Sequence, residues 1–150
     1  MSLNPGKIPH ETLKRVLSHI TSDQLDNRVV IGPKVGQDVA VVDMGEKYMV
    51  CKTDPITFST KEIGYYVVDI NANDIATAGA KPMWFQVTLL LPQESASEEM
   101  CKEIITEIDS ECKRHGISFI GGHTEITFGL NRPIAVGCMM GEVEKDKLVT

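Results

Sequence analysis

Three aspartates stand at the ends of predicted secondary-structure elements, where their carboxylates could bind a metal ion. Asp38 directly precedes an apolar strand expected at 39–43, and Asp54 directly follows a strand expected at 48–53. Asp74 lies on a predicted helix between these strands and the next one. Carboxylate oxygens are hard ligands of the kind that Mg²⁺ prefers. Asp38 and Asp54 could each be an ordinary strand-end residue, but the three acids together could converge on one site in which Mg²⁺ offsets the charge of a polyphosphate.

Asp74 is informative because it interrupts an apolar stripe. Ile63, Val67 and Ile70 follow helical spacing, and the next position on that face holds Asp74, with Asn71 one turn earlier. A carboxylate on an inward face is costly unless it is paired or binds a metal. Two interpretations remain open: this end of the helix is exposed to solvent, or the carboxylate points into a site.

Residues that could contact a phosphate lie close to these acids. The loop 32–38 contains Gly36 and Gln37 but lacks the Walker A pattern, so its glycines offer only a close backbone approach. Lys52 and Thr53 directly precede Asp54. Lys52 could bind a phosphate, or it could be an ordinary solvated lysine on a strand.

A second group follows the strand expected at 117–120. Gly121 and Gly122 permit a tight turn and close approach of a ligand. His123, Thr124 and Glu125 come next, and His123 is the best candidate for a general base because its pKa can be tuned near neutrality. His123 and Glu125 could alternatively be metal ligands.

The elements that must position these residues alternate between helices and strands. We expect helices at 9–20, from a capping box at 59–62 to residue 78, and from Ser95 to Gly116. A buried strand at 83–91 and a last strand at 134–140 complete the pattern. Because hairpins are mixed with crossovers, the order predicts an α+β domain with a mixed sheet packed against helices.

Composition excludes several classes of protein. The chain has 150 residues, which suits one domain over 1–150, and its formal net charge is −6 without a basic run. That balance argues against nucleic acid as a partner. We find no membrane segment or signal peptide. The cysteines form no C-x-x-C pair, so we expect reduced thiols and a cytoplasmic location.

Taken together, the motifs resemble one superfamily. The stretches that carry the resemblance are Gly36-Gln37-Asp38-Val39-Ala40, Lys52-Thr53-Asp54, the run from Asn73 to Pro82, and Gly121-Gly122-His123-Thr124. They are similar to the AIR synthase (PurM)-like superfamily, which includes selenophosphate synthetase and thiamine-monophosphate kinase. The details resemble most the AIR-synthase-related proteins and the hydrogenase expression/formation (HypE-like) proteins.

The resemblance implies an N-terminal ATP-binding domain that dimerises through its sheet, with ATP and Mg²⁺ as cofactors. Carried onto this sequence, it implies metal contacts from Asp38, Asp54 and Asp74. It implies nucleotide contacts from Gly36, Gln37, Lys52, Thr53, Asn71, Asn73, Gly121, Gly122 and Thr124. His123 is the expected catalytic base.

Three departures qualify this expectation. Gln37 stands where many relatives have an aspartate, and His123 stands where some have an acid. The second, C-terminal domain of the family is absent from this sequence. We therefore expect ATP-dependent phosphoryl transfer to an unidentified acceptor. The alternative is a non-catalytic, nucleotide-responsive dimerisation or assembly module in the maturation of a metalloenzyme such as hydrogenase.

Overall fold

One mixed sheet and two helices packed on it form the body of the protein. The computed structural model describes residues 3–20 and 26–150. The elements in chain order are α1 (His10–Leu17), β1 (Val29–Ile31), β2 (Ala40–Asp43), β3 (Lys47–Ile56), α2 (Ile63–Thr77), β4 (Lys81–Pro92), α3 (Glu98–His115), β5 (Ser118–Thr127), β6 (Ile134–Glu144) and the short 3₁₀ helix η1 (Lys145–Lys147). This arrangement confirms the predicted α+β class.

The sheet has six strands in the order β1-β2-β3-β6-β4-β5. The pairs β1–β2, β2–β3, β3–β6 and β4–β6 are antiparallel, whereas β4 and β5 are parallel and joined through α3. The last strand thus lies between β3 and β4, and it brings the two halves of the chain into one sheet.

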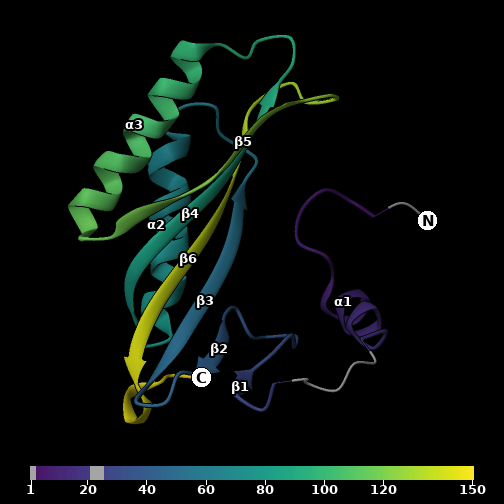
Figure 1. Cartoon of the computed structure of the whole chain (residues 1–150). Coiled ribbons are helices and arrows are strands. Elements are labelled where there is room, and N and C mark those ends of the chain that lie inside the picture. The colour runs from purple at the N-terminus through teal and green to yellow at the C-terminus, as the bar shows by residue number, and fades with distance from the viewer. Residues whose placement is uncertain (1–2, 21–25) are drawn as a thin grey trace.

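Helices α2 and α3 cover one face of the sheet (Figure 1). Residues of β6 alternate between buried and half-buried along the strand, as expected when only one face is covered. Met139 on the covered face is fully buried, whereas its neighbour Met140 is half-buried on the other face. We call this second face, on which Cys51, Trp84, Val136, Cys138 and Met140 lie, the open face.

The two packed helices begin at other residues than predicted. Ser97, not Ser95, caps α3 by accepting a hydrogen bond from the Met100 N–H, whereas Gly116 ends the helix in the left-handed conformation, as predicted. The predicted capping box at 59–62 is wrong. Ser59 donates to the Lys61 carbonyl instead, α2 starts only at Ile63, and Glu62 makes no side-chain cap.

A contact from α3 replaces the missing cap of α2. The Gly64 N–H donates to the Glu107 carboxylate over 2.9 Å, which satisfies one of the free donors at the start of the helix. A side chain at Gly64 would collide with Glu107 and with the Ile104 carbonyl. The glycine therefore lets the two helices approach closely.

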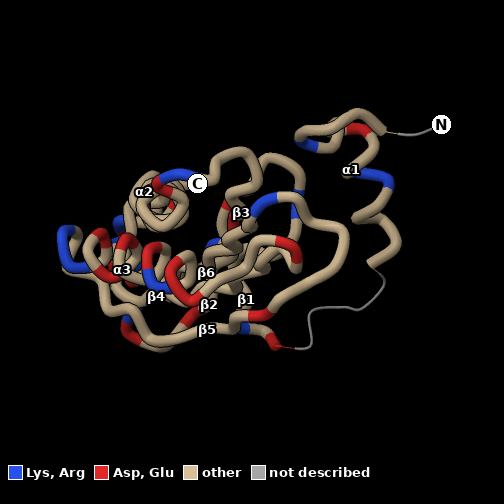
Figure 2. The backbone as a smooth tube through the Cα atoms, turned by 90° about the horizontal axis from the view of Figure 1, so that it is seen from above, with Lys and Arg blue, Asp and Glu red and all other residues tan. Residues whose placement is uncertain are grey.

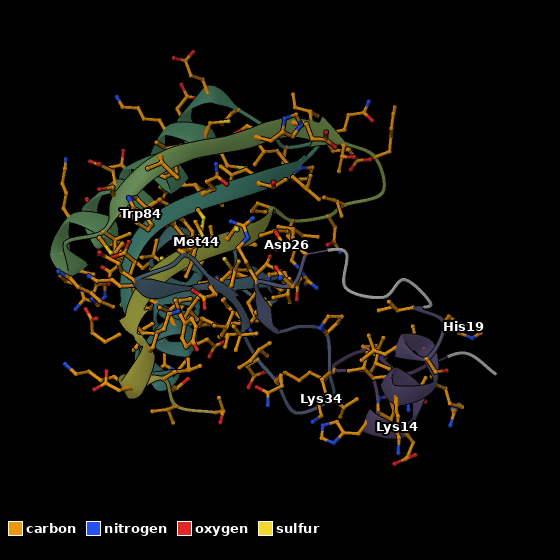
Figure 3. All side chains as sticks on the ribbon, turned by 60° about the horizontal axis from the view of Figure 1, so that its bottom comes forward. Lys14, His19, Asp26, Lys34, Met44 and Trp84 are labelled. Atoms are coloured by element: carbon orange, nitrogen blue, oxygen red, sulfur yellow. The ribbon has the colours of Figure 1, made fainter. Side chains whose placement is uncertain are left out.

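Helix α1 is separate from this body. None of its residues is buried, and Figure 3 shows Lys14 and His19 away from the sheet that carries Trp84. The helix ends at Leu17, so His19 lies just beyond it. Among the helices of residues 3–20 and 26–150, none has the length and apolar character needed to cross a membrane.

Candidate functional site

The three predicted aspartates converge on one lysine. The Lys52 Nζ lies 2.9 Å from Asp74 Oδ2, 3.5 Å from Asp54 Oδ2 and 3.8 Å from Asp38 Oδ1. Lys52 and Asp54 point to the same face of β3 because side chains alternate along a strand, and Asp74 meets them from α2. We call these four residues the acidic site.

The four side chains of the acidic site differ in their exposure to solvent. The side chain of Lys52 is 9% exposed, whereas those of Asp74, Asp54 and Asp38 are 22%, 32% and 75% exposed. The ammonium group therefore lies beneath a set of carboxylates that opens to solvent on the side of Asp38. With one cation among three acids, the acidic site carries a net negative charge that favours a further cation.

The carboxylates keep Lys52 charged. Burial by itself lowers the pKa of Lys52, but its hydrogen bond to Asp74 and the charges of Asp54, Asp74 and Asp38 outweigh that effect. The net result is a pKa above the ordinary value. At neutral pH Lys52 is thus a fixed positive charge and cannot act as a base.

Asn71 positions Asp54 through its backbone. Its side-chain oxygen accepts from the Asp54 N–H over 2.9 Å, and its amide donates to the Asp54 carbonyl over 3.2 Å and to the Val67 carbonyl over 2.8 Å. Asn71 is fully buried. All these polar contacts are made inside the protein, so we treat Asn71 as a positioning residue rather than a nucleotide contact.

Gly137 makes room for this contact, and the sequence analysis did not identify it. It pairs with Asp54 across β3 and β6, and a side chain at this position would collide with Asn71 and Phe85. The only sequence signal was a glycine inside a strand, which is typical of a close approach.

The loop before β2 supplies Asp38. Gly36 has a φ of 85°, which a glycine adopts readily, and the Gln37 N–H donates to the Lys34 carbonyl within the turn. Gln37 is half-buried beside the exposed Asp38. Gly36 and Gln37 adjoin the acidic site through their neighbour Asp38, and the backbone N–H of Gln37 is already used within the turn.

Thr53 and Asn73 are the first of the predicted contact residues that lie elsewhere. Thr53 is on the open face, opposite to its neighbours Lys52 and Asp54, and its hydroxyl donates to the Gly137 carbonyl over 2.7 Å. Asn73 is exposed on another side of α2, where it lines a pocket with Asp69 and His115. Neither residue belongs to the acidic site. Residues that are adjacent in sequence point to opposite faces of a strand and to different sides of a helix.

The segment Gly121–Glu125 is not a loop but part of β5. The strand continues beside β4 because Gly122, with a φ of 151°, lets its backbone approach Val87 where a side chain would collide. Thr124 points to the same side of the sheet as the buried Leu89, toward α3. Gly122 therefore serves close strand packing in this structure, whereas a side chain at Gly121 would meet no neighbour.

His123 lies far from the acidic site within one chain. It is on the open face, where its Nε2 lies 3.0 Å from Glu125 Oε2, and both side chains are exposed. The strand order puts β6 and β4 between β3 and β5, a separation of about 14 Å at the usual strand spacing. The structure thus pairs His123 with Glu125, but does not bring this pair to the aspartates.

A mixed sheet covered on one face by two helices, with an acidic site between β3 and α2, defines an α+β domain. The family model of the AIR synthase related protein, N-terminal domain, matches residues 36–143. The chain therefore belongs to this family, as its motifs predicted.

Similar proteins include enzymes and a maturation factor. Over 99 residues the chain is 33% identical to a thiamine-monophosphate kinase of Methanocaldococcus jannaschii. This alignment covers 60% of this chain and 31% of the kinase. Over 150 residues it is 27% identical to a putative hydrogenase expression/formation protein of the same organism, covering 96% of this chain and 44% of that protein. The chain thus spans less than half the length of these relatives.

Solved structures share the fold. An AaThiL structure complexed with AMPPCP and TMP matches with a TM-score of 0.67 at 18% identity, covering 89% of this chain and 40% of that one. The hydrogenase maturation protein HypE in complex with ATP matches with a TM-score of 0.60 at 17% identity, and the match covers 90% of this chain and 37% of the HypE chain.

Proposed function

We propose that this domain binds ATP together with Mg²⁺ at the acidic site and serves an enzyme that transfers a phosphoryl group from ATP to an acceptor. The observation that carries the proposal is the convergence of Asp38, Asp54 and Asp74 on Lys52. Membership of the family and the nucleotides named in the AaThiL and HypE structures support it.

The donor set fits Mg²⁺. Asp38, Asp54 and Asp74 offer only hard oxygen ligands, and no imidazole or thiolate is among them. These three carboxylates would hold the ion, and the exposed side of the acidic site at Asp38 gives a route for it. When bound, Mg²⁺ neutralises charge on the phosphates and polarises them.

The residues of this chain act by position and charge. Asn71 fixes the backbone of Asp54, and the buried Lys52 holds the carboxylates together. A protonated Lys52 would also offer a hydrogen-bond donor to a phosphate oxygen bound at the acidic site. Phosphoryl transfer needs mainly such positioning and electrostatic stabilisation from the protein.

His123 has a separate role in this proposal. Because it lies on the open face with Glu125, it would act as a general base only where the acceptor or a second subunit brings the reaction to that face. His123→Ala should then abolish turnover while ATP binding by the chain stays intact. Loss of ATP binding in His123→Ala would contradict this assignment.

Calorimetric titration of ATP into the chain, with Mg²⁺ and with EDTA, tests the main proposal. Asp54→Asn and Asp74→Asn should each weaken Mg²⁺-dependent binding at least about tenfold, since each removes a charged ligand. Asp109→Asn is the matched control, because Asp109 forms an ion pair with Lys113 on the surface of α3, away from the acidic site.

Equal binding with Mg²⁺ and EDTA, or equal losses in Asp74→Asn and Asp109→Asn, would contradict the proposed site. ATP turnover by the wild-type protein that fails in Asp74→Asn would favour the enzyme over a non-catalytic assembly module. ATP binding without ATP turnover would favour the non-catalytic assembly module. The sequence feature that supports the module is Gln37, which is neutral where many relatives have an aspartate.

A further inference from the structure

A second cluster of ligand atoms joins the two helices away from the acidic site. His115 Nε2 lies 2.7 Å from Asp69 Oδ1 and 3.1 Å from Glu111 Oε1. All three possible ligand atoms lie within 4.8 Å of one another. Asp69 belongs to α2, whereas Glu111 and His115 belong to α3.

Helix geometry assembles this cluster. Glu111 and His115 are four residues apart, so they project from the same side of α3. Asp69 faces them from α2, which packs against α3 and is also joined to it through Gly64 and Glu107. Acidic residues predominate along α3 and basic ones occur at its C-terminal end (Figure 2). The cluster lies at that end.

One member of the cluster is a buried carboxylate that requires a cation. Glu111 is 4% exposed, and Arg114 contacts its Oε1 as well as the Asp69 carboxylate. The Arg114 side chain is 61% exposed. Arginine therefore balances the two acids from the solvent side, and a long exposed side chain can leave without disturbing the core.

The ligand types select the ion. One imidazole nitrogen and two carboxylate oxygens suit zinc and similar divalent transition metals better than Mg²⁺. A pocket of about 460 Å³ adjoins the cluster and is lined by Asp69, Ala72, Asn73, Ala76, Pro82 and His115. Because a tetrahedral ion with three protein ligands keeps a fourth position, a water or small ligand could bind from this pocket.

We propose that Asp69, Glu111 and His115 form a divalent transition-metal site that joins α2 to α3, with Arg114 as the group that the ion displaces. The site is independent of ATP, because none of its residues belongs to the acidic site. It also gives the exposed Asn73 a neighbourhood in which its amide can contact a metal-bound ligand.

Titration of Zn²⁺ into the chain without nucleotide tests the proposal, with Co²⁺ absorbance as a second measurement. We expect saturable binding of one ion and a rise in melting temperature that EDTA reverses. His115→Gln should weaken the affinity at least about tenfold, since it removes the imidazole ligand of the proposed site. His123→Gln is the control, because it removes the exposed histidine paired with Glu125 on the other face.

Arg114→Gln separates a metal site from a simple ion-pair network. If Zn²⁺ replaces the guanidinium, this variant melts lower without metal but binds Zn²⁺ as tightly as wild type or tighter, and Zn²⁺ restores its melting temperature. If the residues serve only as ion pairs, Zn²⁺ leaves the loss unchanged. Equal Zn²⁺ binding by wild type, His115→Gln and His123→Gln, with folding verified by circular dichroism, overturns the proposal.

Discussion

The side chain of Asn71 hydrogen-bonds to both the N–H and the carbonyl of Asp54, as a neighbouring strand would. Strand β2 pairs with β3 only from Tyr48 to Cys51, so the backbone of Asp54 has no strand beside it on that edge. Asn71 thus extends the order of the sheet beyond the end of β2 and holds a proposed metal ligand in place.

Replacing Asn71 by alanine should lower the free energy of unfolding by about 1–3 kcal/mol, because buried backbone groups of Asp54 lose their partner. Urea unfolding measures this change, and an unchanged m-value would show that the unfolded state is unaffected. The exposed Asn73 is the control on the same helix. Asn73→Ala should stay within about 0.5 kcal/mol of wild type. Equal effects would contradict the assigned role.

Removing the Lys52 charge should make stability depend on divalent cations. In Lys52→Met three carboxylates lie together without their ammonium partner, so they repel one another and bind Mg²⁺ in its place. Melting curves with and without Mg²⁺ should show a larger stabilisation of Lys52→Met than of wild type. Lys102→Met, at an exposed position on α3, should respond like wild type.

The stability difference between wild type and Lys52→Met should depend on pH at alkaline pH. The pKa of Lys52 is raised in the folded state, so its contribution to stability is complete below the unfolded pKa and is lost as pH rises through the folded pKa. The difference in unfolding free energy between wild type and Lys52→Met should be constant from about pH 7 to 10 and shrink above about pH 10.5. A difference that grows with pH would refute this linkage.

Gly122 should be less tolerant of substitution than Gly121, although both have positive φ. A side chain at 122 collides with the Val87 backbone, whereas nothing lies near one at 121. Gly122→Ala should therefore cost more than about 2 kcal/mol, from strain and from displaced strand pairing. Chemical unfolding should be measured for both variants, because Gly121→Ala introduces backbone strain alone and Gly122→Ala adds the collision with Val87. Equal losses of unfolding free energy in the two variants would rule out the collision.

We also propose that a second copy of the chain covers the open face, as the family resemblance implied. No helix among residues 26–150 packs there, and its central residues Trp84, Cys138 and Met140 are only half-buried. Met140→Glu should shift a dimer toward monomer in analytical ultracentrifugation without lowering the stability of the monomer. A wild-type protein that sediments as a monomer at high concentration would contradict the proposal.

Much of the fold could be predicted from local patterns. The apolar period identified α2, α3 and the core strands, and the interrupted stripe located Asp74 and Asn71. The three-residue β1 gave too short a pattern, and β5 was predicted too short because paired glycines usually indicate a turn. Its continuation depends on pairing with β4, which is a tertiary property.

The acidic site could be predicted only in part, because the sequence shows local patterns but not tertiary pairing. Asp38, Asp54 and Asp74 stand at element ends, which a sequence reveals, and they do meet. The central position of Lys52 depends on the strand face and on the distance to α2. The pairing of His123 with Glu125 on the opposite face depends on strand order, and no local pattern contains that information.

Strand β3 carries two independent sets of residues in alternation. Lys52 and Asp54 face the helices, whereas Cys51 and Thr53 face away from them. Single substitutions on this strand should therefore alter the proposed metal binding and the proposed self-association separately, so that one can change without the other. Inserting one residue into the strand would exchange the two sets, so it should disturb both proposed properties at once.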